Sequence, residues 1–428
     1  MLGTYRVNGK EVDSLDLKVL LVTRGVKVRR EVYRKFGRTN RIHPDPQTCN
    51  CLLLPDGTVV HLVDLAMHMG HIKRALSWDT LRALRYALQL RTPFSLEVGP
   101  SGGPVLLWKG EEVTAVTFPP ASPFYQQRTS SGLPFLGNAT LQALDFLSFQ
   151  CLWPCQYAQA GHACQFCYSG GLFERLARKG RPMPAMPTPR DVAEITHYAF
   201  TVEHAAKHLQ LTGGSTMNTR AECATVKGFL GEIDRVVGVK NIPGEILIYT
   251  TPPRDPTEVD QLFSAGADRI ACSLEVWDEE LARVITPGKW KFAGRQRYLD
   301  CLKYIATRYG PNRACCSFVV GLEPAESYLE AARTLASEGI VPIASIWMPF
   351  GRPVQGRMRT PGLHYYRQVK EGLAAIYDTF GIVPPGSNGL NVCVCRDAWN
   401  HRGAILGRSP ATCCEPAVRH LAHAAVSR

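Results

Sequence analysis

The chain has little of what would place it in or across a membrane. No apolar run approaches the roughly 20 residues that a membrane-spanning helix needs. Residues 1–7 lack a basic region followed by an apolar one, which is the pattern of an export signal. No internal repeat is visible. We therefore expect a globular, cytoplasmic protein with no membrane partner.

Cysteine, in contrast, is abundant, with 15 among 428 residues. Without an export signal a disulfide framework is not expected, so metal or redox chemistry explains these cysteines better. The formal net charge of +12 is spread along the chain and is densest at residues 27–41, where such runs are usually solvated surface. This charge is compatible with nucleic acid, which we do not favour, and equally with an acidic or phosphate-bearing small molecule.

Hydrophobic patterns divide the chain into three predicted regions. Residues 1–140 form a β-rich N-terminal region, 141–355 a region of alternating strands and helices, and 356–428 a C-terminal extension with a helix and a cysteine-containing segment. Apolar runs around Asp56-Gly57 and Lys109-Gly110 predict two hairpins in the first region. The sequence further predicts helices at 78–90 and 363–380, a helical C-terminus, and a linker at 119–137, which is rich in proline, serine and glycine.

The middle region has the pattern of a parallel sheet, because short apolar runs alternate with helical segments. The predicted strands are 144–150, 209–212, 245–250, 269–275, 316–321 and 343–349, and the predicted helices are 188–206, 219–237, 256–265, 292–308 and 325–338. This α/β pattern fits a doubly wound sheet or an open (β/α) barrel. In both folds, ligands bind at the carboxyl ends of the strands.

Four cysteines lie directly after the first predicted strand of this region, at Cys151, Cys155, Cys164 and Cys167. Cys164 and Cys167 are separated by two residues, so both sulfurs can face one metal or cluster edge. The choice lies between an iron–sulfur cluster, a zinc site and a disulfide. Zinc takes four ligands, and Cys151 or His162 could provide the fourth. Packing alone is a poor explanation for so dense a cluster.

A second motif follows the next predicted strand, where Gly213-Gly214-Ser215 allows a ligand to approach the backbone closely. Cys-x2-Cys with the aromatic Phe166 before the last cysteine, followed one β/α unit later by Gly-Gly-Ser, resembles the radical S-adenosylmethionine (radical SAM) superfamily. The resemblance covers about residues 143–350. Cys155, Cys164 and Cys167 give a Cys-x8-Cys-x2-Cys spacing, longer than the usual Cys-x3-Cys-x2-Cys but similar to that of the elongator-type subgroup.

The resemblance implies a partial (β/α)6 radical SAM barrel, a [4Fe-4S] cluster and S-adenosylmethionine. It implies Cys155, Cys164 and Cys167 as cluster ligands, with Cys151 as the alternative first ligand. It also implies cofactor-binding roles for Phe166, Gly213, Gly214, Ser215, Ser273, Glu275 and Arg295. In this reading one iron stays open for S-adenosylmethionine, and reductive cleavage yields a 5′-deoxyadenosyl radical that abstracts hydrogen from a substrate.

Four later cysteines, Cys393, Cys395, Cys413 and Cys414, are candidates for an auxiliary iron–sulfur cluster, with Cys49 and Cys51 as further ligands. The alternative is that they are ordinary buried thiols. Strand-end residues are substrate contacts by position only: Tyr249, Thr250, Arg254, Glu323, Trp347 and Arg352. A cobalamin site around His68 and His71 is disfavoured, because no Rossmann-like pattern surrounds these histidines.

We therefore expect a radical SAM enzyme that acts on a small molecule in cofactor or metabolite biosynthesis. It would receive electrons from a donor such as flavodoxin or ferredoxin. Two alternatives remain open at this stage. The basic charge and the long-gap motif are compatible with a tRNA-modifying radical SAM enzyme, and the cysteines with a zinc-stabilised binding protein that has no enzymatic activity.

Overall fold

The computed structural model describes residues 2–36, 51–61, 67–68, 92–119, 122–142, 144–152, 154–167, 174, 176–182, 186–348, 358–388 and 393–407. The predicted helices at 78–90 and at the C-terminus lie outside these residues. No helix within them is long and apolar enough to cross a bilayer.

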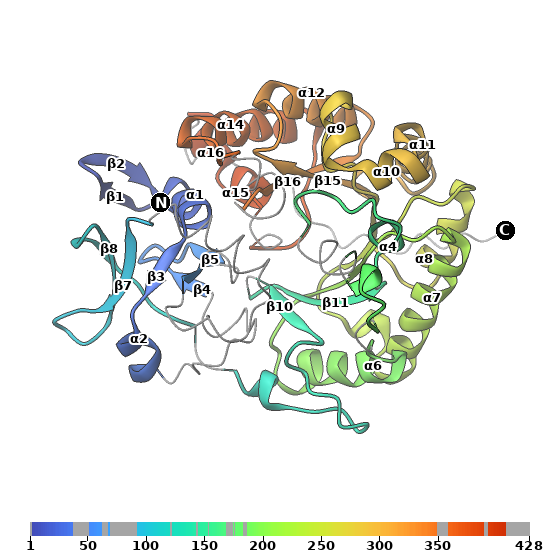
Figure 1. Cartoon of the computed structure of the whole chain (residues 1–428), viewed down its shortest axis with the longest axis horizontal. Coiled ribbons are helices and arrows are strands. Elements are labelled where there is room, and N and C mark those ends of the chain that lie inside the picture. The colour runs from blue at the N-terminus through green and yellow to red at the C-terminus, as the bar shows by residue number, and fades with distance from the viewer. Residues whose placement is uncertain are drawn as a thin grey trace.

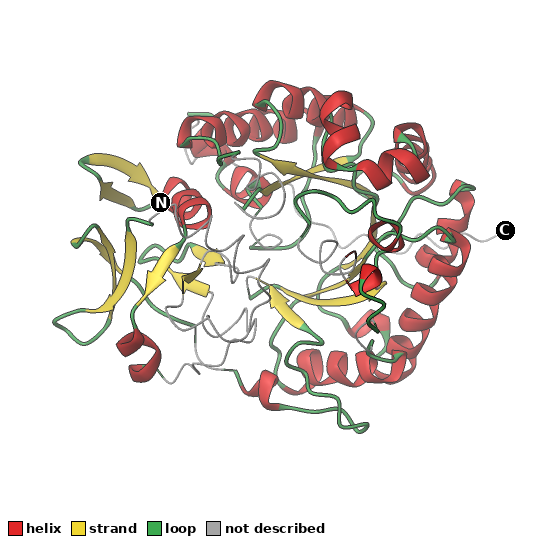
Figure 2. Cartoon of the chain, in the orientation of Figure 1, coloured by secondary structure: helices red, strands yellow, loops and turns green. Residues whose placement is uncertain are grey.

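A seven-stranded sheet forms the centre of the protein (Figure 2). Its strands are β10 (Thr140–Gln142), β11 (Phe146–Leu152), β12 (His208–Gly213), β13 (Ile246–Tyr249), β14 (Arg269–Ala271), β15 (Ala314–Val320) and β16 (Val341–Ile346). They lie side by side in chain order. The strands β11 to β16 pair in parallel, and β10 adds an antiparallel edge.

Helices connect these strands. They are α6 (Pro189–His197), the π-helical turn η3 (Tyr198–Val202), α7 (Thr219–Val236), η5 (Pro256–Val259), α8 (Asp260–Ser264), α9 (Glu279–Ile285), α10 (Pro287–Phe292), α11 (Arg295–Tyr309) and α12 (Ala325–Ser337). Those at 219–236, 256–264, 295–309 and 325–337 follow the predicted bounds closely, and two short helices after β14 were not predicted. Figure 1 shows them in an arc around the outside of the curled sheet. Strands in sequential order with helices on one face form an open barrel rather than a doubly wound sheet. The predicted (β/α)6 barrel is confirmed.

Helix α6 begins as its sequence predicts. Thr188 is the N-cap, its hydroxyl accepts a hydrogen bond from the Asp191 backbone, and Pro189 occupies the first helical position. The Asp191 carboxylate returns a bond to the Thr188 backbone and so completes a capping box. The helix does not reach residue 206 as predicted, because it passes into the π-helical turn after His197.

The predicted linker at 119–137 is packed structure. The short 3₁₀ helix η2 (Pro123–Gln126) buries Phe124 completely against Phe135 and Tyr198. The hydroxyl of Thr129 donates to Asp191 at 2.8 Å, which fastens the segment to α6. Turn-forming residues are frequent here because the chain changes direction often, and the aromatic side chains between them provide the packing.

The N-terminal region contains both predicted hairpins. Strands β4 (Cys51–Leu53) and β5 (Val59–His61) form one, and β8 (Pro104–Trp108) and β9 (Glu111–Ala115) form the other. The remaining elements are β1 (Thr4–Val7), β2 (Lys10–Asp13), α1 (Ser14–Arg24), β3 (Val26–Val28), α2 (Arg30–Lys35), β6 (Met67–His68) and β7 (Phe94–Val98). Helix α1 was not predicted, because it is buried almost all round and lacks a polar stripe.

The C-terminal extension covers the β16 edge of the open barrel. Helix α14 (Leu363–Phe380) has the predicted bounds and packs on α12 and α1. The chain then pairs with β16 through a bridge between Ser345 and Cys393, and the Val394 amide donates to the Ala344 carbonyl at 3.0 Å. Helices α15 (Cys395–Asn400) and α16 (Arg402–Ile405) follow. Because α1 also contacts β16, both end regions of the chain lie at this edge.

Candidate active site

The cysteine-rich loop follows β11 at the carboxyl end of the parallel sheet. Cys155 is the N-cap of the one-turn helix α4 (Gln156–Gln159), and Cys164 and Cys167 lie in the loop beyond it. All three residues are half-buried. Burial raises the pKa of the Cys164 thiol; Lys289 opposes this rise, while Cys167, Glu275 and Cys155 add to it. The thiols of Cys155 and Cys167 therefore lie within electrostatic range of Cys164, as do the side chains of Lys289 and Glu275.

Cys151 lies apart from this group. Its side chain is 6% exposed and belongs to the apolar core of the barrel. Burial is the cause of the raised pKa of its thiol, and no charged group contributes. The other proposed zinc ligand, His162, accepts a hydrogen bond from the Lys291 ammonium through Nε2, at 2.9 Å. Within the described residues, no three His, Cys, Asp or Glu side chains are grouped so as to hold one metal ion.

The Gly213–Ser215 turn packs directly on the cysteine-rich loop. A Cβ atom at Gly214 would lie 2.3 Å from the Cα atom of Cys155, so only glycine fits at this position. The Gln156 amide donates to the Ser215 carbonyl at 2.8 Å. On the opposite side, a Cβ at Gly288 would lie 2.5 Å from the His162 carbonyl oxygen. The loop is thus held between the end of β12 and the start of α10.

A buried ion pair follows β14. The Lys289 ammonium donates to Glu275 Oε1 at 2.7 Å and to the Ser273 carbonyl at 2.5 Å. Burial opposes the charge of Lys289, but Glu275, Tyr298 and Cys164 raise its pKa, so it remains a cation. Sequence reasoning did not select Lys289 as a site residue, since nothing local in the sequence shows that α10 returns to Glu275.

The backbone of Glu275 is left-handed, with φ of 73°, which is rare for a residue with a side chain. Its amide donates to the Ser317 carbonyl, and its carbonyl accepts from the Val319 amide, both at 2.9 Å. The predicted strand therefore stops at Ala271, and the chain pairs again with β15 only at Glu275. Such conformations cost on the order of 1–3 kcal/mol and cluster at functional sites.

Phe166 and Arg295 occupy different surroundings. Phe166 packs on an apolar cluster at the strand ends that includes Val276, Val319 and Trp347. Arg295 stacks on Trp277, with its guanidinium carbon 3.7 Å from the ring centroid, and donates to the Trp277 carbonyl at 2.8 Å. Phe166 therefore lies at the barrel mouth beside the cysteines. The recorded contacts of Arg295 stabilise the loop after β14.

Three strand-end residues proposed as substrate contacts have internal partners. The Tyr249 hydroxyl bonds to Ser317 Oγ at 3.1 Å, and the Thr250 hydroxyl donates to Glu222 Oε1 at 2.7 Å. The Glu323 carboxylate accepts from the Trp277 amide at 3.0 Å and from the Asp278 amide at 2.9 Å. Arg254 is exposed, Trp347 is buried in the cluster beside Phe166, and Arg352 lies outside the described residues.

The later cysteines are described only in part. The sulfurs of Cys393 and Cys395 lie 3.0 Å apart and are buried. Both thiols lie close enough to the Lys18 ammonium to raise the pKa of Lys18. Burial raises the pKa of Cys51, and Lys18 opposes this rise. Lys18 forms a 2.8 Å ion pair with Asp397. Cys49, Cys413 and Cys414, together with His71 of the disfavoured cobalamin site, lie outside the described residues.

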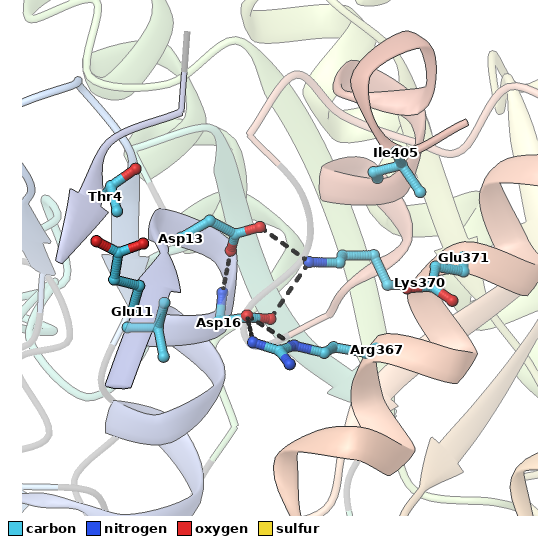
Figure 3. A pocket seen from close by; sticks show the side chains of 9 residues that line it. Thr4, Glu11, Asp13, Asp16, Arg367, Lys370, Glu371 and Ile405 are labelled. Atoms are coloured by element: carbon cyan, nitrogen blue, oxygen red, sulfur yellow. Dashed lines mark hydrogen bonds and ion pairs between the residues drawn. The ribbon is translucent and has the colours of Figure 1, made fainter. Parts of the chain in front are cut away.

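A cavity of about 370 Å³ lies between the hairpin of β1 and β2 and helix α14 (Figure 3). Its walls carry none of the predicted site residues. Asp16 Oδ2 accepts from Arg367 at 2.5 Å, and the buried Lys370 ammonium lies 3.5 Å from Asp13 and 3.4 Å from Asp16. These ion pairs connect the N-terminal region to the C-terminal extension.

The residues around the cysteine-rich loop provide donors of the kind that a cluster and its cofactor need, although the side chains that the structure describes are not drawn together around one metal position. The donor set offers three thiols on one loop. Ser273 Oγ, Tyr157 Oη and Tyr298 Oη are buried without a hydrogen-bond partner in the described part of the chain. Buried polar atoms are rarely left without a partner, so these atoms are available to a ligand or water. The close packing of Gly214 on Cys155 lets a ligand reach the backbone beside the thiols.

Comparisons with known proteins give a family for the middle of the chain. Residues 160–340 match the model of the Radical SAM superfamily. The bacteriochlorophyllide c C-7(1)-hydroxylase of Chlorobaculum limnaeum is 22% identical over 292 residues, which cover 66% of this chain and 72% of that protein.

Two solved structures show limited similarity. HydG, a maturase of the [FeFe]-hydrogenase, has 12% identity and a TM-score of 0.40, over 54% of this chain and 48% of its own. Methylornithine synthase (PylB) has 16% identity and a TM-score of 0.38, over 53% of this chain and 61% of its own. The matched part thus spans between about half and three-fifths of these two proteins.

Proposed function

Since this chain belongs to the radical SAM superfamily of enzymes, we propose that it holds a [4Fe-4S] cluster through Cys155, Cys164 and Cys167. When reduced, such a cluster supplies the electron that cleaves S-adenosylmethionine to a 5′-deoxyadenosyl radical, which abstracts hydrogen from the substrate. Enzymes of this superfamily act on small molecules and take electrons from a reductant. We propose a flavodoxin or a ferredoxin as the donor.

The proposal depends above all on one observation: Cys155, Cys164 and Cys167 lie on one loop at the carboxyl edge of the sheet, and the Glu275–Lys289 ion pair lies within electrostatic range of Cys164. Three thiolates would hold three irons and leave the fourth open to a ligand. The carboxylate of Glu275, fixed by Lys289, would accept a hydrogen bond from the cofactor's hydroxyl or ammonium groups.

The remaining cofactor contacts follow from the same edge of the sheet. The backbone of Gly213, Gly214 and Ser215 would bind the polar end of S-adenosylmethionine, and the unpartnered Ser273 hydroxyl would add a further bond. Phe166 would form an apolar wall that excludes water. Arg295 would stabilise the Trp277 loop rather than touch the cofactor, because its guanidinium is engaged there.

Cys155 is preferred to Cys151 as the first ligand. Cys155 lies against Gly214 and within electrostatic range of Cys164, whereas the Cys151 side chain lies in the apolar core. Moving the Cys151 thiolate to a cluster would require the end of β11 to rearrange. The buried Cys151 behaves as a small apolar residue.

For the reaction, we propose hydrogen abstraction from a C–H bond of an organic small molecule. One relative is named as a bacteriochlorophyllide c C-7(1)-hydroxylase. Its name supports oxidative change at an unreactive carbon as the reaction class. Cofactor or metabolite biosynthesis is the corresponding cellular role.

We further propose an auxiliary iron–sulfur cluster held by Cys393, Cys395, Cys413 and Cys414. Its support is the contact between the Cys393 and Cys395 sulfurs at 3.0 Å, beside the Lys18 ammonium. A cation close to thiols favours their deprotonated, metal-binding form; here it acts against burial and the Cys393 contact, which raise the pKa of Cys395. The total iron content distinguishes a protein with the auxiliary cluster from one without it, since a second cluster would add about four irons for each chain.

Anaerobic reconstitution of alanine variants tests the ligand assignment. Cys155→Ala, Cys164→Ala and Cys167→Ala should each lose the iron of the radical SAM cluster, and Cys151→Ala, as the matched control, should keep it. A Cys155→Ala protein that keeps its iron beside a Cys151→Ala protein that loses it would refute the assignment. A colourless wild-type protein with one tightly bound zinc would refute the cluster itself.

A further inference from the structure

A buried carboxylate, Glu222, lies in the first turn of α7 and is not explained by the proposed chemistry. Its side chain is 4% exposed. Oε1 accepts hydrogen bonds from the Thr250 hydroxyl and the Thr251 amide, both at 2.7 Å. Oε2 is buried and has no partner among the described residues. A carboxylate that uses only one oxygen is costly to bury as an anion.

From Glu222, hydrogen bonds lead to the next loop of the barrel. Thr251, at the end of β13, accepts from the Thr216 amide through Oγ1 at 3.1 Å. Thr216 directly follows the Gly213–Ser215 turn. The position of this turn relative to β13 therefore depends on the side chain of Thr251, and Glu222 holds the backbone of Thr251.

The same chain of bonds ends at the cysteine-rich loop. Gln156, next to Cys155, accepts from the Thr216 hydroxyl at 2.9 Å and from the Met217 amide at 2.7 Å. The backbone amide of Gln156 donates to the Ser215 carbonyl at 2.8 Å. Three successive loops, after β11, β12 and β13, are thus connected through Gln156, Thr216 and Thr251.

We infer that Glu222 is a positioning residue, which through Thr251 and Gln156 fixes the Gly213–Ser215 turn against the cysteine-rich loop. The fit it maintains is tight, because the Gly214 Cα and the Cys155 backbone leave no room for a methyl group. The importance of this fit for cofactor binding rests on the proposed function. The positioning itself is a property of the chain and can be measured separately.

The charge of Glu222 changes near neutral pH. The titratable groups that face it are Tyr157 from α4, Cys272 after β14 and Cys223 on its own helix, and burial raises the pKa of Tyr157 and Cys223. For Cys272 the contact with Cys301 is the largest cause of the raised pKa, followed by burial. All three are neutral at pH 7. Burial raises the pKa of Glu222 from 4.5 to about 7. A buried Glu222 therefore keeps a proton that a water-exposed Glu222 has released, so opening of these loops should become easier as pH rises from about 4.5 to 7.

Hydrogen exchange of the full-length reconstituted protein tests this inference. In Glu222→Ala, the peptide covering residues 213–218 should exchange about tenfold faster than in the wild type, the effect of losing roughly one hydrogen bond. Thr251→Val keeps its amide bond to Glu222 but loses the acceptor for Thr216, so it should accelerate the same peptide and leave α7 unchanged. The matched control is Glu232→Gln, a partly exposed residue on the same helix that forms an ion pair with Arg235.

The pH profile separates positioning from a merely structural role. After correction for intrinsic rates, wild-type exchange at residues 213–218 should increase between pH 5 and pH 7 and level off above pH 7. Glu222→Gln keeps an oxygen acceptor and never ionises, so exchange at residues 213–218 should not increase with pH in this variant. The inference is overturned if Thr251→Val and Glu222→Ala exchange like the control, or if Glu222→Gln keeps the pH dependence. If the exchange pattern holds but the wild type never cleaves S-adenosylmethionine, only the proposed function fails.

Discussion

Replacing Glu222 with glutamine should remove a pH dependence from the stability of the protein. The pKa of Glu222 is raised from 4.5 to about 7 by burial, so the folded state holds its proton where the unfolded state has released it. The folded state therefore binds more protons between pH 4.5 and 7, and stability falls as pH rises through this window. At about 1.4 kcal/mol per pH unit, the loss approaches about 3 kcal/mol by pH 8.

Urea unfolding of the cluster-free full-length protein at pH 5, 6, 7 and 8 measures this difference. The stability of Glu222→Gln relative to the wild type should increase steadily with pH and reach a plateau above 7. The new amide group brings its own desolvation cost, but this cost does not change with pH and cancels from the comparison. Parallel stability curves for the two proteins across the range would show that Glu222 is already ionised, and would refute the reasoning.

Two further substitutions test the packing of the loop and the contact between the end regions. Gly214→Ala should destabilise the protein by about 1–3 kcal/mol and reduce iron loading, because its Cβ would lie 2.3 Å from the Cys155 Cα; thermal unfolding and iron analysis measure both effects. Asp16→Asn should cost about 3 kcal/mol in urea unfolding, because it leaves the buried Lys370 ammonium with only Asp13 at 3.5 Å.

Each substitution has a matched control. Gly231→Ala lies in the exposed middle of α7 with no atom within 4 Å of the added methyl, so it should stabilise the protein by up to about 1 kcal/mol. Glu279→Gln breaks the ion pairs of an exposed carboxylate with Arg283 at 3.8 Å and Arg295 at 3.7 Å, and should change stability by less than about 0.5 kcal/mol. If Gly231→Ala destabilised the protein as much as Gly214→Ala, the loss would not come from the contact with Cys155. If Glu279→Gln destabilised it as much as Asp16→Asn, the loss would not come from the buried Lys370.

The barrel could be predicted from sequence because its signals are local. Alternating apolar runs and helical segments gave all six parallel strands, and the bounds of Leu363–Phe380 matched completely. Helix α1 escaped prediction because it is buried on most of its surface, so no polar stripe marks it as helical. The short α9 and α10 also escaped prediction, since each is a brief helix fixed by its contacts with the rest of the barrel.

The features of the site also differ in how local their sequence signals are. Cysteine spacing and the Gly-Gly-Ser turn lie in short stretches of sequence, so both could be found there. The contact of Lys289 with Glu275, the bonds of Gln156, and the placement of Cys151 in the apolar core depend on distant segments meeting. The same holds for Glu323, whose carboxylate accepts hydrogen bonds from two backbone amides and from the Ser327 hydroxyl.

The most direct test of the central claim is the fate of S-adenosylmethionine. The reconstituted wild-type protein, reduced under anaerobic conditions, should convert it to 5′-deoxyadenosine and methionine. Cys164→Ala, prepared in the same way, should not. Formation of methylthioadenosine in place of 5′-deoxyadenosine would mean that a different sulfonium bond is cut. That result, or equal amounts of 5′-deoxyadenosine from the two proteins, would contradict the proposed radical chemistry.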